Sequence, residues 1–428
     1  MEITPRLLVY IWLPALLFSA CPSEPDGPSP EKAYYSEILW EREVNRSAVS
    51  ELPPLIKGQY CYLPASENYP GGGLNIVKIN MEEKGRVEWE SSRIDYISAE
   101  KIGSHIYLLG GSGLIFVLND SDGKLAATVK LAENNAITSF VSSVAVLGPY
   151  LFWVRDGLMR FNSGLIDFSK PPGTIQNIAP EQIWSDPPQT RIFADFLLEN
   201  GILYFFTRYY IYSPNFALVD FIPEIPTILI ALDAETGDVI WERETPHCKG
   251  VGTGIGDNSL ILNGDKLLVV EGAETRYFLD GETIRVAEIT FSSYDKLTGV
   301  PVLENILLDN DEGGYSFGRI ALYNNRLFYL VGRSELVSVN ADTGDLIWSD
   351  FPSRYSTYAS PLVNNGKVFM LHETGLRVYN ADTGEFMGVD ASFGAEYGVQ
   401  FSHEIAIYKD AYIFFNERSR YVTAIRCK

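Results

Sequence analysis

Three stretches of the chain share one pattern of apolar and polar positions. Each has an alternating apolar run, then Asp or Asn, Ala, a variable residue, Thr and Gly, then a second apolar run. The stretches are IALDAETGDVIW (230–241), VSVNADTGDLIW (337–348) and RVYNADTGEFMG (377–388). Alternation with a period of two indicates strands, and the Asp or Asn followed by Gly is typical of a tight turn. Each stretch is therefore predicted to be strand, turn and strand.

The turn glycine recurs along the chain at Gly85, Gly123, Gly237, Gly299, Gly344 and Gly384. The shorter intervals are 38, 40 and 45 residues. Each unit also carries an earlier hairpin signal, such as IALYNNRLFYLV (320–331) or PLVNNGKVFML (361–371). One unit is thus four antiparallel strands, and repetition of such units predicts an all-β fold, a β-propeller.

The two ends of the repeat complete each other. The last unit, 396–428, has three predicted strands, while ILWERE (38–43) stands alone near the start and matches VIWERE (239–244). Pairing this strand with the last unit would remove two exposed sheet edges. The sequence therefore predicts one domain, 36–428, an eight-bladed propeller closed by its N-terminal strand. Seven blades, with residues 165–184 as an insertion, is the alternative.

The N-terminus predicts export. An apolar run of 14 residues, Leu7–Ala20, follows Arg6 and precedes Cys21. This length suits a signal peptide, and Ser19-Ala20-Cys21 resembles a lipobox. We expect residues 1–20 to be a signal peptide, Cys21 to carry a lipid on the periplasmic side of a bacterial membrane, and the Pro-rich segment 21–35 to be a disordered tether. A plain cleaved signal peptide is the alternative.

Composition narrows the class of partners. The formal net charge of −21 argues against nucleic-acid binding, which needs basic residues to neutralise phosphates. With Cys21 lipidated, Cys61, Cys248 and Cys427 remain. Cys61 and Cys427 lie in the first and last units, so closure could pair them in a disulfide; three buried thiols are the other interpretation.

The repeated LDAETGDVIW pattern resembles the repeat of the pyrroloquinoline-quinone-like (PQQ-like) eight-bladed propellers over residues 36–428. In that family the Trp packs between neighbouring blades. The resemblance implies this role for Trp40, Trp89, Trp241 and Trp348. Ala127, Leu303 and Gly388 stand at the same place in other units, where we expect looser junctions.

The resemblance leads to two branches with different functions. One contains quinone-dependent dehydrogenases; the other contains non-enzymatic lipoproteins, typified by the propeller subunit of the outer-membrane barrel-assembly machinery. The vicinal Cys-Cys of most such dehydrogenases is missing here. The acidic run 309–314 begins like a calcium loop, but its twelfth position is Ile320. No His pair has metal spacing, and no catalytic residue is assigned. PQQ and Ca²⁺ are therefore not expected, and neither is enzyme activity.

Long loops between predicted strands are candidates for partner binding. They are 64–73, 208–227 and 272–285. The second is aromatic, with Tyr209, Tyr210, Tyr212, Phe216 and Phe221. Such a loop either binds a partner or covers its own blade. The sequence favours a monomeric, lipid-anchored scaffold that binds envelope proteins through its loop face and touches the membrane only through the lipid. A PQQ- and Ca²⁺-dependent oxidoreductase or a carbohydrate-binding propeller are the alternatives.

Overall fold

The computed structural model describes residues 36–43, 47–48, 54–66, 74–94, 96, 98–110, 113–131, 144–154, 157–185, 190–209, 227–245, 260–279, 282–311, 320–331, 335–350, 361–372, 375–390, 406–409, 411–415 and 421–427. The chain divides into two units, Met1–Lys32 and Ala33–Lys428, and the first lies outside the described residues. Within the described residues, no helix is long and apolar enough to span a membrane.

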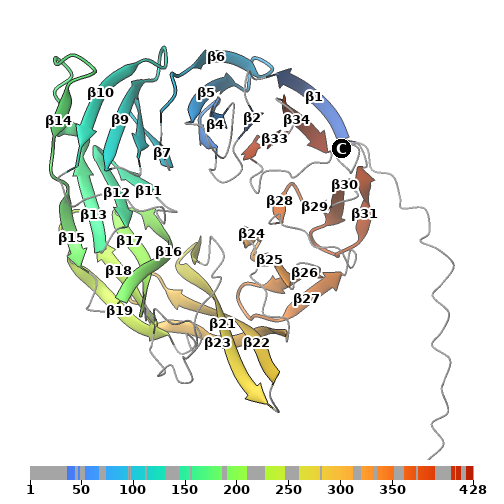
Figure 1. Cartoon of the computed structure of the whole chain (residues 1–428). Helices are drawn as coiled ribbons and strands as arrows, with labels where there is room; N and C mark the ends of the chain where they lie inside the picture. Colours follow the sequence, from blue (N-terminus) through green and yellow to red (C-terminus); the bar gives the residue numbers. More distant parts are fainter. Residues whose placement is uncertain are drawn as a thin grey trace, which may run out of the picture. The chain divides into compact units, whose positions relative to one another are not determined.

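The described strands form eight sheets, which we number in chain order (Figure 1). The first sheet has β2 (Ser47–Ala48), β3 (Leu55–Lys57), β4 (Tyr60–Ser66), β5 (Asn75–Asn80) and β6 (Arg86–Glu90). The second has β7 (Ser98–Ile102), β8 (His105–Leu109), β9 (Leu114–Asn119), β10 (Leu125–Lys130) and β14 (Ile175–Asn177). The third has β11 (Val144–Leu147), β12 (Tyr150–Val154), β13 (Gly157–Asn162) and β15 (Glu181–Ser185); a short 3₁₀ turn, Ser163–Leu165, follows β13.

The remaining sheets repeat the four-stranded plan. The fourth has β16 (Thr190–Glu199), β17 (Ile202–Tyr209), β18 (Thr227–Asp233) and β19 (Val239–Thr245). The fifth has β20 (Leu260–Asn263), β21 (Lys266–Leu279), β22 (Glu282–Asp295) and β23 (Pro301–Asp311). The sixth has β24 (Ala321–Tyr323), β25 (Arg326–Val331), β26 (Glu335–Asn340) and β27 (Leu346–Asp350). The seventh has β28 (Leu362–Asn364), β29 (Lys367–His372), β30 (Gly375–Asn380) and β31 (Phe386–Asp390).

The eighth sheet joins the two ends of the chain. It has β32 (Ala406–Tyr408), β33 (Ala411–Phe415) and β34 (Tyr421–Cys427), with β1 (Ser36–Glu43) as its outer strand. β1 runs antiparallel to β34, and Trp40 lies opposite Ala424. The predicted closure of the last unit by the N-terminal strand is therefore confirmed.

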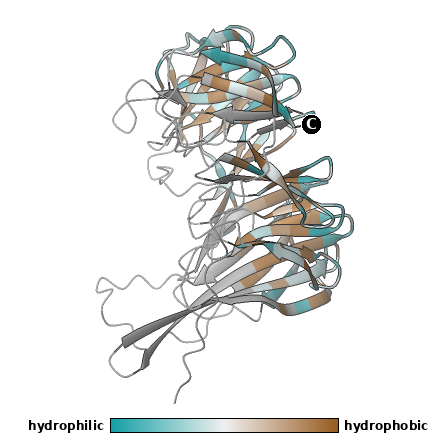
Figure 2. Cartoon of the chain, turned by 90° about the vertical axis from the view of Figure 1, so that its right-hand side faces the viewer, coloured by the Kyte–Doolittle hydropathy of each residue, from teal (hydrophilic) through white to brown (hydrophobic). Residues whose placement is uncertain are grey.

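The apolar core lies between successive sheets. One buried cluster joins the eighth sheet to the first. Six more join the first sheet to the second, the second to the third, and so on up to the sixth and seventh. A hydrogen bond of 3.3 Å from Asn364 to the carbonyl of Lys409 joins the seventh sheet to the eighth. Apolar residues run along the strands, whereas hairpin turns are polar (Figure 2). Sheets that pack face to face in sequence are the arrangement of a β-propeller, so the predicted all-β propeller class is confirmed.

The repeated motif forms one turn in several sheets. In the fourth sheet, the Asp233 carboxylate accepts hydrogen bonds from the amides of Glu235 and Thr236 at 2.9 and 2.8 Å. The Gly237 amide donates to the Asp233 carbonyl at 2.9 Å, and φ at Gly237 is +81°. Asp295, Asn340 and Asn380 cap their turns in the same way. The motif therefore stabilises the turn through its own side chains.

The residue before the Trp is an extra residue in the outer strand. In β19, Val239 pairs with Leu232 and Trp241 pairs with Ala231, so Ile240 has no partner across the pair. The same one-residue register shift precedes Trp89 and Trp348. A bulge of this kind bends the strand and redirects the side chain that follows.

Each Trp then contacts the turn of the next sheet. A Cβ on Gly384 would lie 2.6 Å from Trp348, and a Cβ on Gly299 would lie 2.6 Å from Trp241. The indole NH of Trp348 donates to the Ala381 carbonyl at 3.1 Å, and that of Trp241 donates to the Lys296 carbonyl at 3.0 Å. We call this contact the Trp–Gly interlock. It makes the turn glycine necessary for packing as well as for its positive φ.

Two junctions use other residues. Gly344 packs against Ile306, which lies three positions beyond Leu303, the position that matches Trp in the sequence. The pairing of β22 with β23 has three register shifts. The residue that packs on the glycine is therefore not the one found by counting from the turn in the sequence. Gly237 faces the Ile183 backbone, and Trp184 beside it packs edge-on to Phe205 with ring centroids 5.2 Å apart. The sequence interpretation did not assign Trp184, although Ile183-Trp184 repeats the Ile-Trp pairs of β19 and β27.

One further expectation is wrong, one open question about a cysteine is decided, and one segment has a double role. Residues 272–285, expected to be a loop, belong largely to β21 and β22, which extend as 14-residue strands in register. Cys61 is a free, buried thiol in the apolar cluster of the first sheet, so it has no disulfide with Cys427. In 165–184, β14 adds a parallel strand to the outer edge of β10, and β15 is the fourth strand of the third sheet.

The Trp–Gly interlock can be tested with a pair of glycine variants in the seventh sheet. Gly384→Ala places an alanine at a φ of +72°, and Gly366→Ala places one at +73°. Of these two glycines, only Gly384 has a Trp packed against it. We expect Gly384→Ala to lower the free energy of unfolding by about 1–3 kcal/mol more than Gly366→Ala, the usual cost of overpacking. Urea unfolding of the two variants measures the difference; equal losses would remove the packing role.

Candidate functional site

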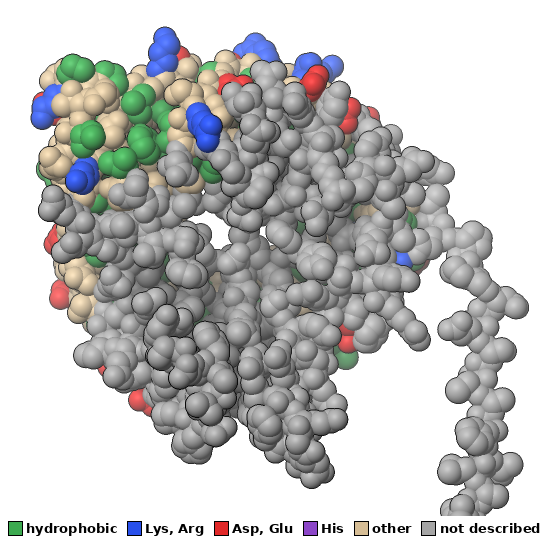
Figure 3. Space-filling model, viewed as in Figure 1, with side chains coloured by type: hydrophobic (Ala, Val, Ile, Leu, Met, Phe, Trp, Pro, Cys, Tyr) green, Lys and Arg blue, Asp and Glu red, His purple; other side chains and the backbone are tan. Residues whose placement is uncertain are grey.

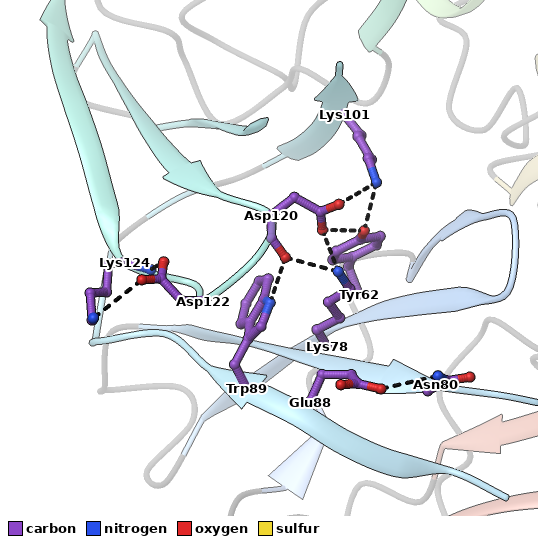
Figure 4. Close-up of polar contacts among 9 residues, drawn as sticks. All are labelled: Tyr62, Lys78, Asn80, Glu88, Trp89, Lys101, Asp120, Asp122 and Lys124. Atoms are coloured by element: carbon purple, nitrogen blue, oxygen red, sulfur yellow. Dashed lines mark hydrogen bonds and ion pairs between the residues drawn. The ribbon is translucent and has the colours of Figure 1, made fainter. Parts of the chain in front are cut away.

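A polar network lies between the first and second sheets (Figure 4). Tyr62 on β4 donates its hydroxyl to Asp120 Oδ1 at 2.5 Å. Lys78 on β5 reaches the same oxygen at 2.7 Å and the Asp120 carbonyl at 2.8 Å. Lys101 on β7 reaches Asp120 Oδ2 at 2.5 Å. Trp89 donates its indole NH to the Asp120 carbonyl at 2.8 Å, so the network includes a Trp–Gly interlock.

The electrostatics of this network indicate that Asp120 stabilises the contact between the two sheets and is not a reactive group. We call Asp120 and its partners the Asp120 clamp. The side chains of Lys78 and Asp120 are 8% and 17% exposed. Burial acts to raise the pKa of Asp120, but hydrogen bonds from Lys101, Lys78 and Tyr62 outweigh it and lower the pKa. Burial, and then the Asp120 carboxylate, raise the pKa of Tyr62, which therefore stays a donor. Since both carboxylate oxygens already accept hydrogen bonds from strong donors, Asp120 joins two sheets and has little capacity to act as a base.

The sequence interpretation missed this network, although it contained a signal. Lys78 lies in NIVKIN, a strand in which every residue is buried. Lys is almost never fully buried unless it is paired. A lysine inside an apolar strand thus indicates a nearby carboxylate, but the sequence does not say which one.

A pocket of about 400 Å³ lies where β1 closes onto the first sheet, and we call it the seam pocket. Its lining residues are Leu39, Trp40, Met81, Glu82, Lys84, Tyr408, Lys409 and Ala411. They come from β1, from the turn after β5, and from the hairpin of β32 and β33. Its volume is in the range typical of ligand pockets, about 300–1,000 Å³.

An ion pair joins the first and eighth sheets beside this pocket. Lys409 Nζ lies 2.7 Å from Glu82 Oε1, and the Tyr408 hydroxyl donates to the same oxygen at 2.9 Å. The hydrogen bond from Lys409, followed by that from Tyr408, lowers the pKa of Glu82. Glu82 is therefore ionised at neutral pH and already accepts two hydrogen bonds.

Trp40 differs from the other interlocking tryptophans. A Cβ on Gly85 would lie 2.5 Å from its ring, so Trp40 packs on the turn glycine of the first sheet. It is half-buried, whereas Trp89, Trp241 and Trp348 are 8–9% exposed. The NH groups of those three donate to a carbonyl of the next turn, but no acceptor for Trp40 is found in the described residues. The closure seam is thus the more open junction.

The other residues selected from the sequence lie outside this description. Cys21 precedes the described residues, and the side chains of Tyr209, Tyr210, Tyr212, Phe216 and Phe221 lie outside them. Asp309–Asp311 belong to β23, but their side chains also lie outside. Among the side chains that are described, no group of three His, Cys, Asp or Glu residues is placed to hold a metal ion. Lipidation and the aromatic loop therefore stay predictions.

The repeated turns, the four-stranded antiparallel sheets and the Trp–Gly interlocks together define a β-propeller fold, and the repeated turn resembles that of PQQ-like propellers. No family model matches the chain. The structure is similar to that of BamB from Moraxella catarrhalis, with a TM-score of 0.57 and 13% identity over 92% of this chain and 98% of that chain. It is also similar to quinohemoprotein alcohol dehydrogenase from Comamonas testosteroni, with a TM-score of 0.52 and 11% identity over 91% of this chain and 76% of that chain.

One curated relative matches a short segment. Quinoprotein alcohol dehydrogenase PedH of Pseudomonas putida is 33% identical over 79 residues, which are 16% of this chain and 13% of the dehydrogenase. The matched segment thus spans about an eighth of that enzyme. These similarities establish the fold, and they confirm the resemblance to PQQ-like propellers that the repeated turn predicted.

The Asp120 clamp predicts a stability that depends on pH. Asp120→Asn leaves Lys78 and Lys101 without their carboxylate, so we expect a loss of about 2 kcal/mol at pH 7. A carboxyl whose pKa is lowered on folding stabilises the protein above its unfolded pKa, about 4 for Asp, and this contribution is lost as the pH falls further. The difference between wild type and Asp120→Asn should therefore shrink at pH 3.

Urea unfolding at both pH values measures this difference. The control is Asp122→Asn, which changes an exposed carboxylate paired with Lys124 in the same turn. It should leave stability nearly unchanged. A wild-type protein that is no more stable than Asp120→Asn at pH 7 would contradict the clamp.

Proposed function

We propose that this chain is a non-enzymatic β-propeller that binds other proteins of the cell envelope and is held at a membrane by a lipid on Cys21. The proposal keeps one domain, residues 36–428, as the scaffold, with a monomer as its working form. The observation that carries it is a set of exposed apolar side chains on the outer strands of three consecutive sheets, the fourth to the sixth.

These apolar side chains lie on or next to β19, β23 and β27. Large apolar residues that are at least 37% exposed there are Val239, Ile240, Leu297, Val300, Val302, Leu346 and Ile347. The bulge before each Trp contributes, because it places two apolar residues in succession on an outer edge. Exposed apolar surface on an outer strand is a cost for a protein that works alone, and it is typical of a surface that meets a partner.

The charge of the chain also bears on the class of partner. Basic and acidic side chains are interspersed on the described part of the face in Figure 3. The acidic total charge of −21 favours protein partners over nucleic acid. The likeness to BamB, which extends over 98% of that chain, supports a scaffold in the envelope by analogy of fold. Export is supported by the apolar run before Cys21.

A quinone-dependent oxidoreductase is the second candidate. The segment shared with quinoprotein alcohol dehydrogenase PedH favours it. Incubation with PQQ and Ca²⁺, followed by a dye-reduction assay with primary alcohols, separates the two candidates. Dye reduction faster than that of a heat-denatured control would support the oxidoreductase and contradict the non-enzymatic scaffold.

Partner binding is tested by changing the apolar outer strands. We expect the double variant Ile240→Asp/Leu346→Asp to capture its envelope partner at least tenfold less than wild type, because interface anchors commonly contribute about 2 kcal/mol or more each. Quantitative mass spectrometry of crosslinked, affinity-purified complexes measures the loss. Leu165→Asp, which replaces a 60% exposed residue next to the third sheet, is the control. Unchanged capture by a folded double variant would contradict the surface.

Anchoring is tested independently at the N-terminus. Cys21→Ser removes the thiol that would carry the lipid, so the protein should move from the membrane fraction to the soluble fraction and lose labelling by radioactive palmitate. Cys248→Ser should change neither result. Palmitate labelling that persists in Cys21→Ser would show that the anchor lies elsewhere.

A further inference from the structure

The seam pocket offers more hydrogen-bond donors than acceptors. Among the side chains described around it, Lys84 and Lys409 bring ammonium groups and Trp40 brings an indole NH, while Glu82 is the single carboxylate. Glu82 already accepts from Lys409 and Tyr408. No described group accepts from the Lys84 ammonium or from the Trp40 indole. Two donors at the pocket are therefore available to a ligand.

We propose that the seam pocket binds a small amphipathic carboxylate, with the carboxylate at Lys84 and the indole NH of Trp40. The apolar part of the ligand lies on Leu39, Met81 and the Trp40 ring. Met81 is 5% exposed, and Leu39 and Trp40 pack against the same buried cluster of the first and eighth sheets. The pocket thus presents an apolar floor and a basic rim, the combination that an apolar chain ending in a carboxylate requires.

The charge of the pocket lining favours a ligand with a negative charge. The chain as a whole carries −21, so an anion approaches most of its surface against repulsion. The lining of the seam pocket has two lysines and one glutamate, an excess of positive charge. Arg42 lies beside it, with its Nε 2.8 Å from the Lys84 carbonyl. A neutral apolar compound would leave these donors without acceptors, so the carboxylate should decide affinity.

Binding at this place would also stabilise the closure of the domain. The lining combines β1, the turn after β5, and the hairpin of β32 and β33, which are the first and last parts of the folded chain. A ligand that contacts all three binds the closed form and not the unfolded chain, so it raises the unfolding temperature with concentration. Trp40, whose NH lacks an acceptor in the described residues, would gain one.

The probe is sodium octanoate, with 1-octanol as the compound that lacks the charge. Isothermal titration calorimetry of the full chain should show saturable octanoate binding, and octanol should bind at least tenfold more weakly. Lys84→Gln removes the charge but keeps a polar side chain, and it should weaken octanoate binding about tenfold, the usual effect of losing one charge-assisted hydrogen bond. Thermal unfolding should rise with octanoate in wild type and less in Lys84→Gln.

Two controls keep the result specific to this pocket. Lys124→Gln removes an 80% exposed lysine from the turn after β9, the counterpart of the Lys84 turn in the second sheet, and it should bind octanoate as wild type does. Trp40→Phe keeps an aromatic ring without the NH and should weaken binding. Equal affinity in wild type and Lys84→Gln, or equal affinity for octanol and octanoate, would overturn the proposal. So would the absence of binding.

The carboxylate could belong to a free amphiphile or to the C-terminus of a protein chain. The peptide acetyl-Gly-Leu-Phe as the free acid, compared with its amide, separates these sources. Tighter binding of the acid peptide than of octanoate assigns the pocket to a protein terminus, and tighter binding of octanoate assigns it to a free amphiphile. Either result supports the carboxylate. The pocket lies between the first and eighth sheets, so these titrations do not depend on the outer strands tested for partner capture.

Discussion

The contact between a tryptophan of one sheet and the turn glycine of the next is the constraint on which the structure depends. It combines three requirements at one point: a positive φ, a missing Cβ, and a backbone carbonyl that accepts the indole NH, as at Gly384, Trp348 and Ala381. Because the bulge before the Trp turns the ring toward the neighbouring sheet, a local feature of one strand sets the packing of two sheets. Stability is thus built from nearest-neighbour contacts, as in other repeat proteins.

The Trp–Gly interlock differs from one junction to the next, and these differences locate the candidate functional surfaces. Between the first and second sheets, the Asp120 clamp adds two ion pairs to the interlock, so that junction is held by charge as well as by packing. At the closure seam, Trp40 packs on Gly85 without an acceptor for its NH in the described residues, and a pocket forms beside it. On the outer strands, the bulge that directs the Trp inward leaves Ile240 and Ile347 exposed. One local geometry therefore produces both the core contact and the surface that we assign to partners.

The sequence predicted much of the fold because its information is local. Asp233, Thr236 and Gly237 make a turn through hydrogen bonds within five residues, so their spacing is readable along the chain. The match of β1 to β19 also predicted closure, since an outer strand has the same pattern wherever it lies. The prediction of a loop at 272–285 was wrong, because an unusually long segment between turns was interpreted as a loop. In the structure, β21 and β22 continue their pairing for 14 residues. Of the two interpretations of Cys61 that the sequence left open, the structure has the buried thiol, because Cys61 packs as a small apolar side chain.

What the sequence determined by itself is the repeated unit: four strands, a capped turn, and a Trp placed four residues after the Gly. Only the tertiary structure decided which residues meet between units. Tyr62, Lys78, Lys101 and Asp120 are separated by up to 58 residues, and Lys409 meets Glu82 across 327. The physical reason is that turns are stabilised by neighbours in the chain, whereas ion pairs and pockets need side chains from different sheets. Their geometry exists only after closure has brought the two ends of the chain together.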